Sequence, residues 1–132
     1  MDMIRRMEMT YSYKPVLIKA ILKLADSRGK VQLDEIVSFF REFYDARIRA
    51  GLTAEKQNSI FAKGGYTDKE TIRNILAYPF KRFEYMQMLR HTKTLGIVQV
   101  DEAVWKHLSD DEKAEIEQIC EEKLKAYYER LM

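Results

Sequence analysis

Apolar positions in the first half of the chain follow the three- and four-residue intervals of amphipathic helices. One such stretch, 15–28, is predicted to be a helix that ends at Gly29. A second stretch, 33–50, has acidic residues in its first turn and arginines in its last, as the helix dipole favours, and is predicted to end at Gly51. A short extended link at 30–32 joins the two helices.

The middle of the chain combines a weak pattern with a clear helix start. Within residues 52–66 we expect a short helix, capped by Thr53 and running through Phe61. The string T-D-K-E at 67–70 is a capping box, in which side chains and backbone N–H groups at the helix start satisfy each other. A third helix therefore begins there, and Pro79 interrupts or kinks it.

The segment 86–100 fits a helix poorly and a β-hairpin better, because Met86 and Met88 alternate with polar residues and Gly96 offers a turn. Asp101 then caps a short helix. A second capping box, S-D-D-E, opens the last helix. The apolar face of that helix is predicted to contain Ile116, Ile119, Cys120, Leu124, Tyr127, Tyr128 and Leu131.

This order of elements is similar to a winged helix-turn-helix domain with a helical C-terminal extension. The segments that carry the resemblance are KPVLIKAILKLAD, KVQLDEIVSFF, TDKETIRNIL and MLRHTKTLGIVQV. The chain departs from the motif where fifteen residues separate Gly51 from Thr67, because the usual connection before a recognition helix has about three or four. The fold class we expect is α+β and mainly α-helical, with a winged-helix-like core, one β-hairpin and a C-terminal helical extension.

Short apolar strings give a second resemblance. KPVLIKAILKLAD, NSIF and AVWKHL, followed by a helix that ends in two tyrosines, resemble accessory helical domains of bacterial restriction enzymes and helicases of phage defence. This resemblance implies an accessory role in a larger assembly.

Composition limits the class of protein. The chain has 132 residues, of which 46% are hydrophobic and 33% charged, and this length suits one domain that needs no disulfide or metal to fold. Its single cysteine excludes an internal disulfide, and no apolar run reaches the ~18 residues of a membrane span. We expect a cytoplasmic protein, with residues 1–10 as a flexible leader and 11–132 as a single domain.

Charge is unevenly distributed, although the net charge is only +2. Residues 41–93 contain eleven Lys and Arg against six Asp and Glu, whereas residues 101–132 contain five against ten. Such a local excess is what phosphate binding requires; the alternative is a solvated helical surface of mixed charge. The pattern favours a surface for nucleic acid, duplex DNA in particular, formed by Lys63, Lys69, Arg73, Asn74, Lys81, Arg82, Arg90 and Lys93.

Two details add to this prediction. Lys63 and two glycines directly precede a helix start, where free N–H groups hold anions; a flexible turn with a cap is the alternative. Arg73 and Asn74 are residue types that read guanine and adenine edges, and the predicted helix phase turns both outward, as it would any exposed polar residue.

Signals for catalysis are weak. His91 and His107 have no metal-ligand spacing, and Cys120 is expected to be inert core packing. The E-x-K string at 121–123 lies on a predicted helix with no aspartate on a strand before it. We therefore expect a non-enzymatic module without metal or cofactor.

The alternative function is a protein–protein interaction subunit of a larger bacterial defence or regulatory assembly, or a homodimer. Tyr127 and Tyr128 are the candidate partner-binding residues, because large amphipathic side chains often anchor interfaces. The competing interpretation is that one of them packs against the core while the other faces water.

Overall fold

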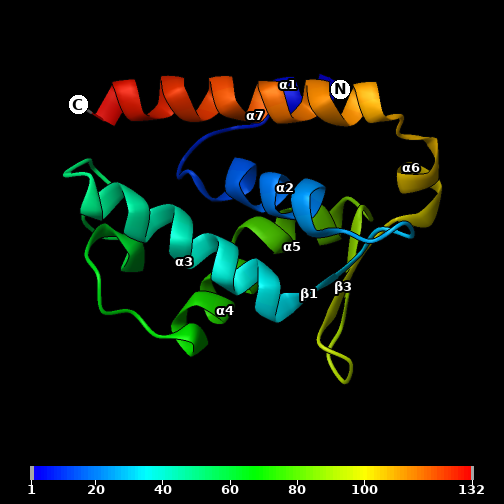
Figure 1. Ribbon diagram of the computed structural model, residues 1–132, viewed down its shortest axis with the longest axis horizontal. Coiled ribbons are helices and arrows are strands. Elements are labelled where there is room, and N and C mark those ends of the chain that lie inside the picture. Colours follow the sequence, from blue (N-terminus) through cyan, green and yellow to red (C-terminus); the bar gives the residue numbers. More distant parts are fainter. Residues whose placement is uncertain (1, 132) are drawn as a thin grey trace.

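The computed structural model describes residues 2–131 and is mainly helical (Figure 1). Its elements follow the predicted order. They are α1 (Asp2–Arg5), α2 (Tyr13–Leu24), β1 (Lys30–Gln32), α3 (Leu33–Arg49), a 3₁₀ turn η1 (Ile60–Ala62), α4 (Asp68–Ala77), α5 (Pro79–Tyr85), β2 (Leu89–Thr92), β3 (Ile97–Val100), α6 (Glu102–His107) and α7 (Asp110–Leu131).

The sheet has three antiparallel strands in the order β1-β3-β2. The predicted hairpin is confirmed as β2 and β3, with Leu89 opposite Val100. The segment 30–32, predicted to be only an extended link, is instead a strand that pairs with β3 and places Val31 opposite Val98. Three residues are too few to show alternation, so the pairing depends on a partner far along the chain.

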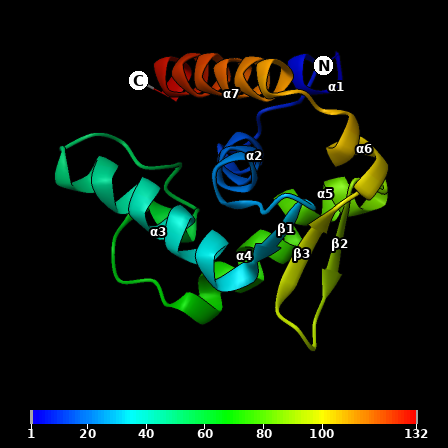
Figure 2. The same cartoon turned by 45° about the vertical axis from the view of Figure 1, so that its right-hand side comes forward.

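Helix α2 lies at the centre of the molecule, packed against α3 on one side and α7 on the other (Figure 2). Its buried side chains include Val16, Leu17 and Ala20, all fully inaccessible. Helix α7 runs across the outside of α2, while α4, α5 and the sheet lie on the far side of α2 from α7. The predicted class, α+β and mainly helical with a hairpin and a C-terminal helix, is confirmed.

The structure confirms most of the predicted helix starts and stops and corrects the end of α2. The Thr67–Glu70 capping box is present at α4, and Ser109 and Glu112 exchange the same pair of bonds at α7. Pro79 divides the predicted third helix into α4 and α5, because it begins the second as its first residue. By contrast, α2 ends at Leu24 rather than at Gly29.

The segment 52–66 contains no helix capped by Thr53, which corrects the prediction. Only η1 forms there, and Ser59 caps it by accepting a hydrogen bond from the backbone N–H of Phe61 at 3.1 Å. The side chains of this segment instead bond to distant elements, as described below, and these contacts hold the backbone in an irregular path.

The N-terminal segment packs on the body of the fold. Ile4 and Met7 are buried, and Arg5 forms an ion pair with Glu115 of α7 at 2.9 Å. Met1 of the predicted leader lies outside the described residues. None of the helices in residues 2–131 is long and apolar enough to cross a membrane.

Candidate functional site

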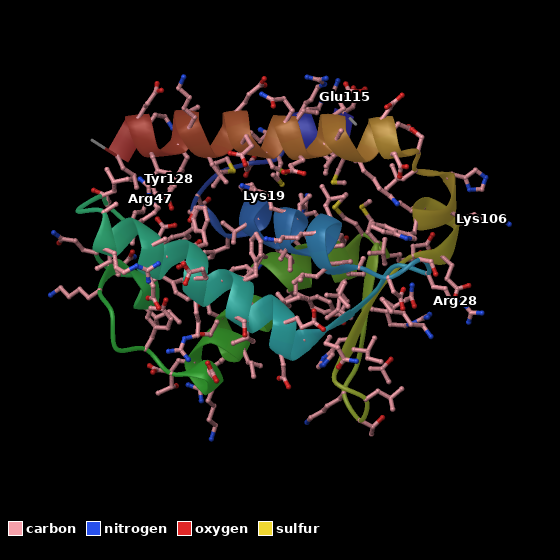
Figure 3. The ribbon with its side chains drawn as sticks, in the orientation of Figure 1. Lys19, Arg28, Arg47, Lys106, Glu115 and Tyr128 are labelled. Atoms are coloured by element: carbon pink, nitrogen blue, oxygen red, sulfur yellow. The ribbon has the colours of Figure 1, made fainter. Side chains whose placement is uncertain are left out.

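The cations of the basic middle region fall into two groups that differ in what they contact. Arg41 pairs with Asp68, Arg49 with Glu42, and Lys56 donates to the carbonyl of Thr10. The fourth member of this group, Arg47, donates a hydrogen bond to the carbonyl of Thr53. Its guanidinium lies 3.5 Å from the ring centroid of Tyr128, and the two residues are labelled side by side in Figure 3. These four cations are engaged in contacts within the chain.

The second group is free. All its members are exposed, and within residues 2–131 none takes part in an ion pair or a side-chain hydrogen bond. These seven are the predicted phosphate contacts Lys63, Lys69, Arg73, Lys81, Arg82, Arg90 and Lys93.

The free cations come from four places in the fold. Lys63 lies in the glycine turn before α4, and Lys69 and Arg73 share the exposed side of α4. Lys81 and Arg82 project from α5 into one groove. The start of α4 and the tip of the hairpin, which carries Lys93, both lie on the side of the molecule away from α7 (Figures 1 and 2).

The carboxylates at the start of α4 are engaged within the protein. Glu70 accepts the backbone N–H of Thr67 at 2.9 Å, and Asp68 pairs with Arg41. Because both are engaged, they oppose an approaching phosphate less than free carboxylates would.

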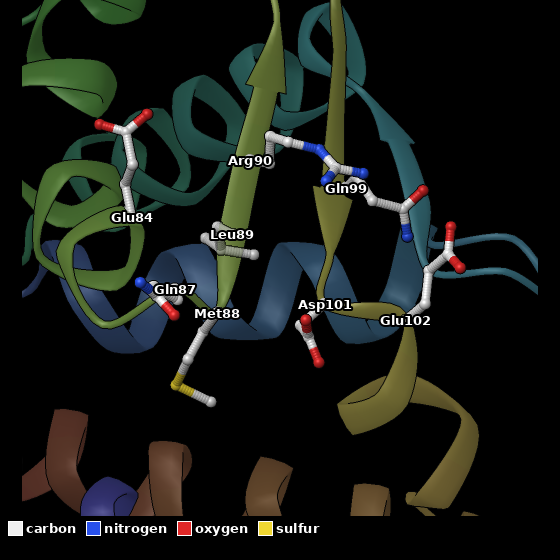
Figure 4. A pocket seen from close by; sticks show the side chains of 8 residues that line it. All are labelled: Glu84, Gln87, Met88, Leu89, Arg90, Gln99, Asp101 and Glu102. Atoms are coloured by element: carbon white, nitrogen blue, oxygen red, sulfur yellow. The ribbon is translucent and has the colours of Figure 1, made fainter.

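Arg90 has a different environment from Lys81 and Arg82. It lines a hollow of about 510 Å³ between α5 and the hairpin, together with the carboxylates of Glu84, Asp101 and Glu102 (Figure 4). A phosphate in this hollow would meet three acids and one base. The hollow therefore suits an anion poorly.

Asn74 corrects the predicted outward face of α4. Its side chain is only 7% exposed and lies close enough to Tyr13 to lower the pKa of that hydroxyl, although burial dominates and raises it to about 12. The buried face of α4 consists of Thr71, Asn74 and Ile75, because contacts with α3 and α5 set the rotation of the helix. Asn74 is therefore not available to a base edge.

Tyr127 and Tyr128 also differ from their prediction as partner-binding residues. Both are buried, at 2% and 7% exposure. Tyr128 donates to the carbonyl of Ala54 at 2.7 Å, and Tyr127 donates to the carboxylate of Glu55. Their burial agrees with their place on the predicted apolar face of the last helix. The hydrogen-bond partners of the two hydroxyls lie in the segment 52–66, and a pattern along one helix does not reveal such partners.

Glu55 is the centre of a buried network. Its Oε2 accepts from the backbone N–H and the hydroxyl of Ser12, at 2.9 and 2.5 Å, and its Oε1 accepts from Tyr127 and from the N–H of Lys56. The Ser12 hydroxyl also meets that of Tyr44 at 2.7 Å. Four donors compensate the desolvation of this carboxylate, which is 3% exposed. The network fixes the backbone around Ser12, and so positions its neighbour Tyr11.

The sequence did not predict a groove that lies between the N-terminal segment around Tyr11 and helix α5. The groove has a volume of about 470 Å³. It is formed by Tyr11, Lys14, Tyr78, Lys81, Arg82 and Tyr85, with Glu8 as its carboxylate. A signal was present in the string YPFKRFEY at 78–85, which places two tyrosines and two cations at positions i, i+3, i+4 and i+7, one face of a helix.

Other chemistry has little basis in the described residues. Between residues 2 and 131 no three His, Cys, Asp or Glu side chains are grouped to hold a metal. Cys120 is fully buried, as predicted, and burial raises the pKa of its thiol to about 12. In the E-x-K string, Glu121 pairs with Lys19, and Lys123 donates to the carbonyl of Met7. These groups hold helix α7 in place.

Comparison of the chain with protein-family models, curated proteins and solved structures finds no match.

Proposed function

We propose that this chain is a nucleic-acid-binding or accessory module that contacts phosphates through the free cations of α4, α5, the glycine turn and the hairpin. The resemblance to winged helix-turn-helix domains points in the same direction. A cytoplasmic location and duplex DNA as a ligand belong to this proposal.

The observation that carries the proposal is the separation of the cations into an engaged group and a free group. A cation already paired with a carboxylate must break that pair before it neutralises a phosphate. A free, hydrated cation meets the phosphate at once, and the counterions released from the nucleic acid drive binding. Six of the seven free cations supply this without any loss of internal contacts, while Arg90 lies among the carboxylates of its hollow.

The arrangement of charge in space supports it further. Helix α7 carries eight acidic residues against four basic ones and covers the side opposite the start of α4 and the hairpin tip. A polyanion would be repelled from the α7 side and attracted to the other. This asymmetry orients the molecule despite its small net charge.

The test is fluorescence anisotropy with a labelled random duplex at about 50 and 200 mM salt. We expect the logarithm of affinity to fall by roughly 0.9 per phosphate contact for each tenfold rise in salt. The double variant K81E/R82E should weaken binding at least tenfold, on the order of two lost contacts. The matched control is K125E/R130E, which changes net charge equally but on exposed positions of α7.

Two results would refute the proposal. One is the absence of binding to duplex and single strand at the lower salt concentration. The other is equal weakening by both double variants, because it would show dependence on net charge alone. Either result would favour the alternative of a protein–protein interaction subunit in a larger assembly.

A further inference from the structure

The groove between the N-terminal segment and α5 exposes aromatic rings that the fold does not use. Tyr85 is 81% exposed, and Tyr78 is 61% exposed. Tyr78 meets Tyr13 at a ring-centroid distance of 6.3 Å, while Tyr85 has no aromatic or hydrogen-bonding partner within residues 2–131. Large exposed rings are more typical of binding surfaces than of a solvated helix face.

Two cations lie between these tyrosines in the sequence. Lys81 and Arg82 lie three and four residues after Tyr78 and line the same groove as both tyrosines. Lys14 faces them from α2 and donates to the carbonyl of Glu8 at 3.2 Å. The groove therefore has three cations against one carboxylate, that of Glu8.

The positive charge extends beyond the groove. A neighbouring hollow of about 480 Å³ shares Glu8, Lys14 and Arg82 with it and adds Arg6. Lys14 and Arg82 line both hollows, and the pKa of Lys14 is lowered by burial and by the nearby charge of Arg82. An anion between them would relieve this repulsion.

The remaining wall of the groove is held by contacts within the chain. Tyr11 stacks on Tyr13 at 4.9 Å with an interplanar angle of 1°, and Lys56 lies 5.1 Å from the Tyr11 ring. Ser12, between the two tyrosines, is held by Glu55. Preorganised walls lower the entropy lost when a ligand binds.

We infer that this groove binds unpaired bases of a single-stranded nucleic acid, with Tyr78 and Tyr85 as stacking platforms and Lys14, Lys81 and Arg82 as phosphate contacts. Rings and cations that line one groove suit a single strand, because its bases stack on the rings while its phosphates contact the cations. In a duplex the base faces are already stacked on one another, so exposed tyrosines gain nothing there. The inference rests on the proposed function and makes it more specific, since it predicts preference for a single strand or overhang over blunt duplex.

The experiment measures anisotropy of three labelled ligands with the full chain: an oligothymidine of about a dozen nucleotides, an abasic strand of the same length, and a blunt duplex. We expect the oligothymidine to bind most tightly. The variant Y85A should lose roughly 5- to 150-fold in affinity for it, the range of one stacked base, with little change for the abasic strand. The control Y85F keeps the ring and should bind normally.

Because Tyr85 is so exposed, its variants should fold, and the melting temperature verifies this. Y78A should have an effect of similar size, and Y78A/Y85A a larger one.

Equal binding of abasic and thymidine strands, or unchanged affinity in Y85A, would overturn the inference. Tight duplex binding that is sensitive to K81E/R82E and insensitive to the tyrosines would overturn it while leaving the proposed function intact. No binding to any of the three ligands would overturn both, and so would preferential binding of an acidic peptide used as competitor.

Discussion

The hydroxyl of Tyr127, in the last helix, donates a hydrogen bond to the carboxylate of Glu55, 72 residues earlier in the chain. The same carboxylate holds Ser12, which precedes α2. One buried acid thus joins the N-terminal segment, the irregular segment 52–66 and helix α7. The wall of the candidate groove depends on this junction.

Removing the Tyr127 hydroxyl tests the junction. Tyr127→Phe removes one of the four hydrogen bonds to the buried carboxylate of Glu55, and a hydrogen bond to a charged group contributes roughly 1.5–3 kcal/mol. We expect that loss in the free energy of unfolding, measured by urea denaturation. The control Tyr85→Phe removes an exposed hydroxyl and should change stability by less than about 0.5 kcal/mol. Equal effects would contradict a structural role for the Tyr127–Glu55 bond.

Gly29 provides a second test of packing. Its φ is +79°, and a Cβ atom there would lie 2.8 Å from Cγ of Trp105. Gly29→Ala should therefore combine backbone strain of about 1–2 kcal/mol with displacement of the indole. Gly51 has φ +74° but open space around it, so Gly51→Ala should show the strain alone. Thermal unfolding of both variants separates the two effects; equal midpoints would argue against the Trp105 contact.

Leu124 tests the cover that α7 forms. Its side chain is 5% exposed within the core, so Leu124→Ala should destabilise the fold by roughly 2–5 kcal/mol. Because this face already packs on α2 of the same chain, the oligomeric state should not change. Urea denaturation and light scattering together check both statements. A stability within error of the unmodified chain would refute the burial.

Arg73 distinguishes base reading from phosphate contact. It is exposed on α4 while its neighbour Asn74 is buried, so the pair does not read bases together. We expect Arg73→Ala to weaken nucleic-acid binding by a similar factor for all sequences, as the loss of a phosphate contact does. Competition between several duplex and single-stranded sequences measures this. A change in sequence preference would instead place Arg73 at a base edge.

The buried phenols predict a dependence on alkaline pH. Burial raises the pKa of Tyr13 and of Tyr128 from 10.0 to about 12, and it also raises those of Tyr44, Tyr66 and Tyr127. A folded-state pKa above the unfolded value means that this stabilisation is complete below about pH 10 and is lost as pH rises through about 12. Tyrosinate absorbance at about pH 11 should therefore increase when urea unfolds the chain. An absorbance unchanged by unfolding would contradict the burial of these phenols.

Much of the local structure was determined by the sequence itself. The capping boxes at Thr67 and Ser109, the stop at Gly51 and the hairpin around Gly96 depend on contacts within a few residues, so their residue types are sufficient to predict them. The charge excess of residues 41–93 was also predictable, because it is a local count, whereas contacts such as that of Arg41 with Asp68 decided which of its cations are free.

The tertiary structure alone decided what depends on distant partners. Strand β1 exists because β3 pairs with it, and Asn74 is buried because α3 and α5 set the rotation of α4. The hydroxyl of Tyr127 has a partner because the fold brings Glu55 to helix α7. The groove belongs to the same class, since residues 8–14 and 78–85 meet only after α2 and α5 pack together. A single helical pattern records which side chains are apolar or polar, but the partner that satisfies a buried polar group, or completes a binding surface, comes from elsewhere in the chain.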